Sequence, residues 1–200
     1  GGCMKYLFFD TETSGLNKKF DYPISFSGRV YDQNFTLIDE IDLQCGLRPH
    51  CIPSCVALAK NYFSIEELKK TNLSYYETIG QIYDFFYKHT PSYTTGFNNI
   101  SFDSELLRQA FYQNLLPPYV EQTLGNERFD LYPTSIAAAV FAPGSIKVGL
   151  NQKQKFDFRL EALSKKNEIS HVLAHTASSD TLATAELCKK IKENAPNFFD

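Results

Sequence analysis

Hydrophobic and polar positions near the start of the chain predict three strands. An apolar, aromatic run at residues 5–10 leads into the polar residues 11–15, a pattern typical of a buried strand that ends in a turn. Two further runs, at residues 24–31 and 35–43, are separated by the polar triplet 32–34, which suits a hairpin turn. The chain is therefore expected to begin as an antiparallel meander.

Helical patterns follow. Ser64 with Glu67, and Ser74 with Glu77, have the spacing of a capping box, and apolar residues recur at helical intervals after the second one. The pattern then predicts a fourth strand at 93–97, a helix at 101–114, a fifth strand at 127–130, and helices at 136–141, from 159, and at 177–193.

This order of elements predicts an α/β fold, a mixed five-stranded sheet flanked by helices that is compatible with a ribonuclease H-like core. The 200 residues suffice for one domain, expected over residues 4–200. Residues 1–3, which precede Met4, have the character of an expression remnant and not of a targeting signal.

Composition favours a cytoplasmic protein. No apolar run approaches the roughly 20 residues of a membrane span. The number of cysteines is odd, which fits a reducing compartment; they are Cys3, Cys45, Cys51, Cys55 and Cys188. A zinc site formed by the middle three and His50 is disfavoured, because no CxxC pair accompanies them.

A net charge of −3 argues against a protein that coats nucleic acid non-specifically, but it does not exclude an enzyme. Residues 144–170 are locally positive, which could favour phosphate.

Acidic residues lie where the predicted elements end. Asp10 and Glu12 are two residues apart at a strand end, so they point to the same face and can share a cation, although such pairs alone are weak signals. Asp103 lies in the first turn of a predicted helix, where an acid also favours the helix dipole. His175 and Asp180 lie at the start of the last helix.

Three motifs in order carry a resemblance to a known family. They are residues 9–15 (FDTETSG), Asn98-Asn99-x-x-Phe102-Asp103 and His175-x-x-x-x-Asp180. The chain resembles the DEDDh 3′–5′ exonucleases, which are DnaQ-like proteins with a ribonuclease H-like fold. Over nearly its whole length it is most similar to the nuclease domain of bacterial exonuclease I.

The resemblance implies a 3′ to 5′ exonuclease that acts on single-stranded DNA and releases 5′-mononucleotides. It implies two Mg²⁺ ions, replaceable by Mn²⁺, held by the hard oxygen ligands of Asp10, Glu12, Asp103 and Asp180. By the same resemblance Asp10 bridges the ions, and His175 is the general base. The family spacing to Asp180 selects His175 over His171.

Substrate contacts are expected around the motifs. Asn99 is expected to position the second strand of the site, and Phe102 either to touch a base or to pack in the core. The residues expected to border the terminal nucleotide are Thr11, Thr13, Ser14 and Gly15.

Three alternatives stay open at this point: an exoribonuclease of the same class, a catalytically silent nucleic-acid-binding module, and a scaffold with coincidental acids. Exonuclease I proteins continue into further domains, so the chain is expected to be either an excised domain or a compact relative. The sequence leaves the oligomeric state undetermined.

Overall fold

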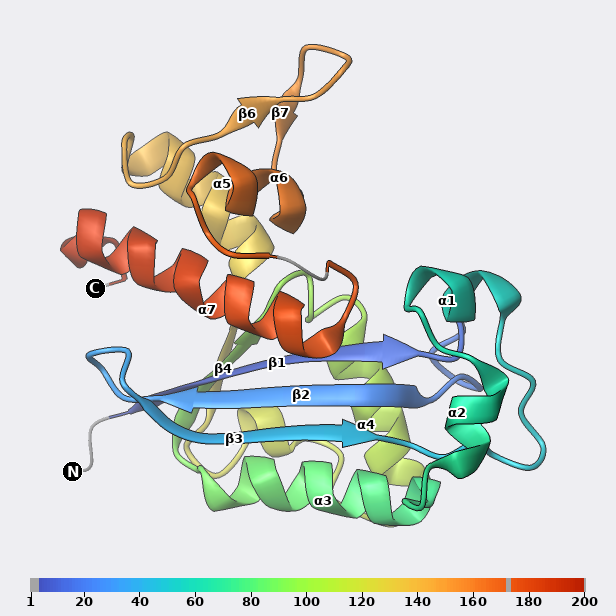
Figure 1. Ribbon diagram of the computed structural model, residues 1–200. Helices are drawn as coiled ribbons and strands as arrows, with labels where there is room; N and C mark the ends of the chain where they lie inside the picture. Colours follow the sequence, from blue (N-terminus) through green and yellow to red (C-terminus); the bar gives the residue numbers. More distant parts are fainter. Residues whose placement is uncertain (1–3, 172–173, 200) are drawn as a thin grey trace.

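The computed structural model describes residues 4–171 and 174–199 and contains the predicted mixed α/β sheet (Figure 1). The five strands lie in the order β3-β2-β1-β4-β5, with the first three antiparallel and the last three parallel. Their bounds are β1 Lys5–Thr13, β2 Pro23–Tyr31, β3 Leu37–Gln44, β4 Ser92–Gly96 and β5 Glu127–Asp130. The predicted fold class is confirmed.

Helices cover both faces of this sheet. In Figure 1, α3 and α4 lie on one face, α7 lies across the other, and α1 and α2 stand beyond the ends of the strands. The helices are α1 Cys55–Lys60, α2 Ile65–Lys70, α3 Tyr75–Lys88, α4 Asp103–Gln113, α5 Leu131–Phe141, α6 Leu160–Lys166 and α7 Ala177–Asn194. Two 3-10 turns, Val120–Gln122 and Pro196–Phe198, complete them.

Strand β1 separates two hydrophobic cores because its side chains alternate between faces. Tyr6 and Phe8 pack with residues of α5, α6 and α7. Leu7 and Phe9 pack with residues of α3 and α4. The same alternation, continued along the strand, directs Asp10 and Glu12 towards α7 and Thr11 towards α4.

Local sequence rules hold at the helices that were predicted. Both capping boxes form, at Ser64 with Glu67 and at Ser74 with Glu77. Strand β1 extends three residues beyond the predicted end, because Thr11, Glu12 and Thr13 continue to pair with β2. The two acids of this motif therefore belong to the strand itself.

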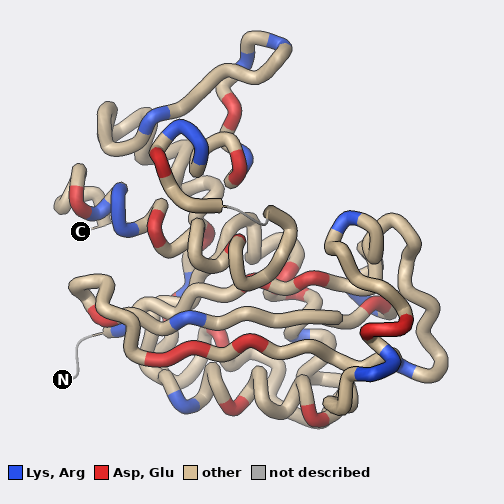
Figure 2. The backbone as a smooth tube through the Cα atoms, in the orientation of Figure 1, with Lys and Arg blue, Asp and Glu red and all other residues tan. Residues whose placement is uncertain are grey.

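Helix α1 and the two strands β6 and β7 were not predicted. Helix α1 is six residues long, buries only Leu58, and has no side-chain cap at Ser54, so neither periodicity nor a capping signal marks it. The strands β6 Gly149–Leu150 and β7 Phe156–Asp157 form a short hairpin in the segment predicted as a loop. Figure 2 shows Lys and Arg along this hairpin and α6, in agreement with the local positive charge of the sequence.

Residues 1–3, Cys3 among them, lie outside the described residues. None of the helices in the described part of the chain is both long and apolar enough to cross a bilayer.

Candidate active site

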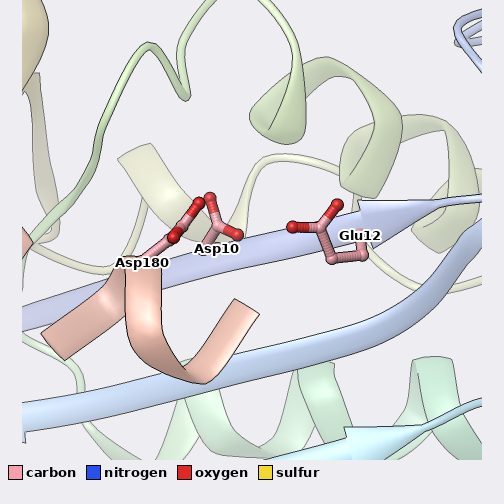
Figure 3. A group of neighbouring side chains, drawn as sticks. All are labelled: Asp10, Glu12 and Asp180. Atoms are coloured by element: carbon pink, nitrogen blue, oxygen red, sulfur yellow. The ribbon is translucent and has the colours of Figure 1, made fainter. Parts of the chain in front are cut away.

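Three carboxylates meet between β1 and the first turn of α7. Asp10 and Glu12 project from β1 on the face that α7 covers, and Asp180 projects from α7 towards them (Figure 3). Each offers one oxygen such that the three oxygens lie within 4.8 Å of one another. The structure thus unites residues separated by 170 positions in the sequence.

Asp103 reaches the same cavity from the opposite side of β1. It is the first residue of α4, and one of its carboxylate oxygens accepts a hydrogen bond from the backbone N–H of Thr11 at 3.2 Å. The hydroxyl of Thr11 donates to the same oxygen. Thr11, predicted to border the substrate, therefore has its hydroxyl engaged in holding Asp103.

The loop between β4 and α4 is shaped by a residue that the sequence analysis did not select. Asp130, at the end of β5, accepts hydrogen bonds from the backbone N–H groups of Asn98 at 2.8 Å and Ile100 at 3.2 Å. It also caps α5 through the N–H of Tyr132. Asn98 itself has a φ of 62°, a conformation that Asn adopts more readily than most residues. Asp130 thereby fixes the approach to Asp103.

Two histidines approach Asp180 in different ways. His175 is one of the residues that line the cavity, and its backbone N–H donates to Asp180 Oδ1 at 3.2 Å. His171, which the sequence analysis set aside, places its Nε2 only 2.6 Å from the same oxygen, with a side chain 7% exposed. The residue that touches the Asp180 carboxylate with its ring is therefore His171, and the residue that faces the cavity is His175.

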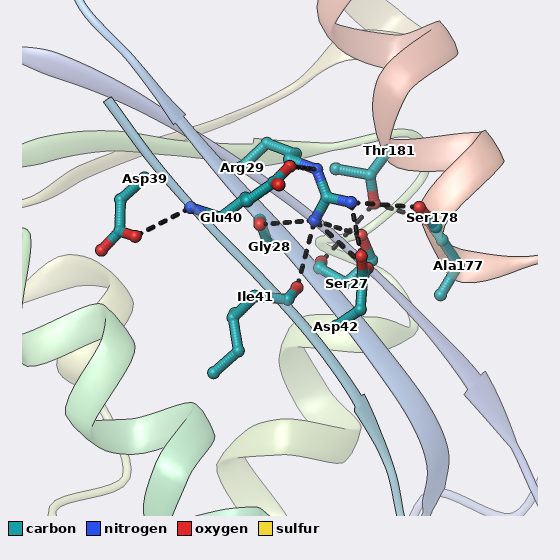
Figure 4. A network of polar contacts seen from close by, with 10 residues as sticks. All are labelled: Ser27, Gly28, Arg29, Asp39, Glu40, Ile41, Asp42, Ala177, Ser178 and Thr181. Carbon is teal, nitrogen blue, oxygen red and sulfur yellow. Dashed lines mark hydrogen bonds and ion pairs between the residues drawn. The ribbon is translucent and has the colours of Figure 1, made fainter. Parts of the chain in front are cut away.

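A buried arginine ties the first turn of α7 to the sheet (Figure 4). The guanidinium of Arg29, on β2, donates to Ser178 Oγ at 3.1 Å and pairs with Asp42 at 2.5 Å and Glu40 at 3.0 Å. Its side chain is 5% exposed, whereas the two acids are about half exposed. Because Ser178 is two residues from Asp180, this network holds the helix turn that presents Asp180.

Burial and the charges of neighbouring acids raise the pKa values of Asp10, Glu12 and Asp103. Burial, followed by the charges of Asp180 and Asp103, raises the pKa of Glu12 to about 8. Burial also raises the pKa of Asp103 to about 6, against the opposing hydrogen bond from Thr11. The pKa of Asp10 is well above its usual range for the same reasons, burial first and then the neighbouring acids.

This arrangement fits a divalent cation. Carboxylates that repel one another near neutral pH ionise together only when positive charge lies between them, and their oxygens are the hard ligands that Mg²⁺ and Mn²⁺ prefer. Among the described residues, the three carboxylates are the group close enough to hold a metal ion.

The acids line a cavity of about 550 Å³, together with some of the predicted substrate contacts. Thr11, Thr13, Gly15 and Phe102 line it, but Ser14 and Asn99 do not. Ser14 is buried and donates to Asp21 at 2.7 Å. Asn99 is 1% exposed and packs against Gly96. A Cβ atom added at Gly96 would lie only 2.8 Å from the Cβ of Asn99.

One cavity wall was missed by the sequence analysis. Helix α1 contributes Val56, Ala57 and Lys60 to the lining, and Asn61 follows them. This segment contains no acidic residue and no family motif, so the sequence alone did not mark it as part of the site. Its position beside the end of β1 in the structure shows that it lines the cavity.

Comparison with known proteins agrees with the predicted resemblance, although no model of a protein family matches the chain. Over 199 residues the chain is 34% identical to the exodeoxyribonuclease I of Buchnera aphidicola subsp. Schizaphis graminum. The aligned region covers 98% of this chain and 41% of that protein. The chain thus spans about two fifths of the length of the relative it matches.

Solved structures give the same result. The crystal structure of Escherichia coli exonuclease I with a dA16 oligonucleotide matches with a TM-score of 0.93 at 29% identity, covering 98% of this chain and 42% of that one. A zinc-bound complex of E. coli exonuclease I with single-stranded DNA matches with a TM-score of 0.92 at 29% identity, covering 100% and 42%. The resemblance to exonuclease I is confirmed.

Proposed function

We propose that this chain removes nucleotides from the 3′ end of single-stranded DNA and releases 5′-mononucleotides. The observation that carries the proposal is the convergence of four carboxylates and one histidine on a single cavity, from β1, α4 and the start of α7. Similarity to an exonuclease I solved with a DNA oligonucleotide supports DNA as the substrate.

Two divalent cations, Mg²⁺ or Mn²⁺, suit the donor set of the site. Asp10, Glu12 and Asp180 would hold one ion, with Asp103 supporting a second, because these four side chains supply only hard oxygen ligands. When bound, such ions neutralise the scissile phosphate, lower the pKa of the attacking water and stabilise the leaving 3′ oxygen.

The protein groups have separate tasks in this proposal. His175, which lines the cavity, would accept a proton from the attacking water, and a positioned base of this kind contributes about 10²- to 10⁴-fold. Thr11 fixes the carboxylate of Asp103, and His171 fixes that of Asp180. Such outer hydrogen bonds orient the groups that hold the metal, and their loss is expected to lower metal affinity or activity.

The test is digestion of a 5′-labelled single-stranded DNA and of its RNA counterpart in Mg²⁺. We expect a ladder of DNA products that shorten from the 3′ end. Asp10→Asn is expected to abolish cleavage, and His175→Ala is expected to reduce turnover about 10²- to 10⁴-fold while oligonucleotide binding persists. Matched controls are Asp84→Asn and His50→Ala, at exposed positions outside the cavity, and both should retain activity.

Other outcomes would revise the proposal in defined ways. Shortening of the RNA alone would reassign the substrate to RNA. Binding of the oligonucleotide without cleavage in any divalent cation would identify a binding module. Normal turnover by His175→Ala would remove this residue from the role of base.

A further inference from the structure

Helix α1 presents one face to the candidate active site. Val56, Ala57 and Lys60 line the cavity, and this spacing of one and then three residues places them on the same side of the helix. In Figure 1, α1 stands beside the end of β1 from which Asp10 and Glu12 project. The wall is therefore apolar at Val56 and cationic at Lys60.

Lys60 is the single Lys or Arg among the described residues that line this cavity. Its side chain is exposed, and the described residues offer it no ion pair. Lys18 differs, because its ammonium pairs with Glu105 and also donates to the carbonyl of Ser101 at 2.9 Å. Lys60 is thus a cation held at the cavity without a fixed partner.

The position of Lys60 is within electrostatic reach of the carboxylates. Lys60 and all four carboxylates line the same cavity. If two divalent cations occupy the site, they balance the four carboxylates, and Lys60 then remains as uncompensated positive charge. A cavity in that state attracts an anion to Lys60.

We propose that Lys60 binds a backbone phosphate of the single strand that enters the cavity. The inference rests on the proposed exonuclease function and assigns a substrate contact to a helix outside the three motifs. Beside Lys60, the exposed side chains of Val56 and Leu16, 77% and 85% accessible, offer apolar contact to the adjoining sugar or base. A cation next to apolar surface can contact both the phosphate and the adjoining sugar or base of a single strand.

The experiment compares Lys60→Met, Lys60→Arg and Lys70→Met with the unmodified chain. Lys70 is a matched control, because it is also the exposed last residue of a six-residue helix, but it does not line the cavity. Both Met substitutions remove one charge from a helix C-terminus, so any effect on the helix dipole is common to them.

Three quantities are measured for each variant: KM and kcat on a labelled single-stranded DNA, the dependence of affinity for a phosphorothioate oligonucleotide on salt, and the affinity for Mn²⁺. Lys60→Met is expected to raise KM about tenfold, because the variant loses one charge-assisted hydrogen bond to the substrate. Its plot of log affinity against log salt should become shallower by about 0.7, the value for one phosphate contact on a single strand. Lys60→Arg should retain most of the affinity, and Lys70→Met should match the unmodified chain.

Mn²⁺ binding separates this role from a structural one. Removing a positive charge near Asp10 and Glu12 should leave Mn²⁺ affinity unchanged or slightly higher, whereas a distorted site would bind Mn²⁺ more weakly. Weaker Mn²⁺ binding by Lys60→Met, or a KM and salt slope equal to those of the unmodified chain, would overturn the proposal. If Lys60→Met has an unchanged KM and salt slope but the unmodified chain degrades DNA, the proposed exonuclease function stands and only the role of Lys60 is lost. If the unmodified chain neither binds nor degrades DNA, both proposals are wrong.

Discussion

Glu121 is a buried carboxylic acid that forms no ion pair within the described part of the chain. It lies in the 3-10 turn Val120–Gln122, is 5% exposed, and accepts a hydrogen bond from the hydroxyl of Ser104 at 2.6 Å. Burial raises its pKa from the usual 4.5 to about 7, although the Ser104 hydrogen bond acts in the opposite direction. Replacing Glu121 by Gln is therefore expected to stabilise the protein at alkaline pH.

The magnitude follows from proton linkage. Between pH 4.5 and about 7 the unfolded chain has lost the proton of Glu121 while the folded chain retains it, so stability falls as pH rises through this window. At about 1.4 kcal/mol per pH unit, the difference between 4.5 and about 7 corresponds to a loss of about 3 kcal/mol. Gln cannot ionise, and Glu121→Gln therefore avoids this loss.

The assay is urea unfolding of both proteins at pH 4.5 and pH 8.5. We expect nearly equal free energies of unfolding at pH 4.5, and a free energy about 2–3 kcal/mol higher for the variant at pH 8.5. Glu186→Gln, at an exposed position on α7, serves as the control and should change stability by less than about 0.5 kcal/mol at both pH values. An equal gain at both pH values, or a loss at pH 8.5, would refute the linkage argument.

Other predictions concern the candidate active site. Because a cation must displace protons from Glu12, with a pKa of about 8, and Asp103, with a pKa of about 6, Mn²⁺ affinity should rise from pH 6 to pH 8, as measured by titration calorimetry. A constant affinity would contradict this. His171→Ala should weaken Mn²⁺ binding about 10- to 100-fold, since it removes the ring that contacts Asp180; unchanged affinity would exclude that role. Arg29→Met should lower the free energy of unfolding by about 1.5–3 kcal/mol in urea titration and also weaken Mn²⁺ binding, whereas lost stability with normal Mn²⁺ affinity would separate the network from the site.

Much of the scaffold could be predicted from local patterns. The alternation in β1, the two capping boxes and the apolar stripe of α4 each operate within a few residues, and each of these elements formed in its predicted segment, although the exact ends differ. The end of β1 was misplaced, because the polar residues of Thr11 to Thr13 read as a turn but continue to pair with β2. Pairing with a neighbouring strand is a tertiary contact that composition does not reveal.

The candidate acids could be selected from the sequence because their chemistry and order are visible there. Asp10 and Glu12 were expected on one face, and the structure places both beside Asp180. The hydrogen bonds that hold these acids in place could not be predicted from the sequence. The contact of Thr11 with Asp103 spans 92 residues, and that of Arg29 with Ser178 spans 149, so no local pattern encodes either one.

The sequence by itself therefore determined most of the helices and strands and the residue types of the site, since hydrophobic period, capping and carboxylate chemistry are local properties. The tertiary structure decided which groups surround those acids. It placed the ring of His171 on Asp180, moved Ser14 and Asn99 away from the cavity, and turned one face of the unpredicted helix α1 towards it. These outcomes depend on how β1, α1 and α7 pack together, because a side chain acquires its neighbours only when distant segments are brought into contact.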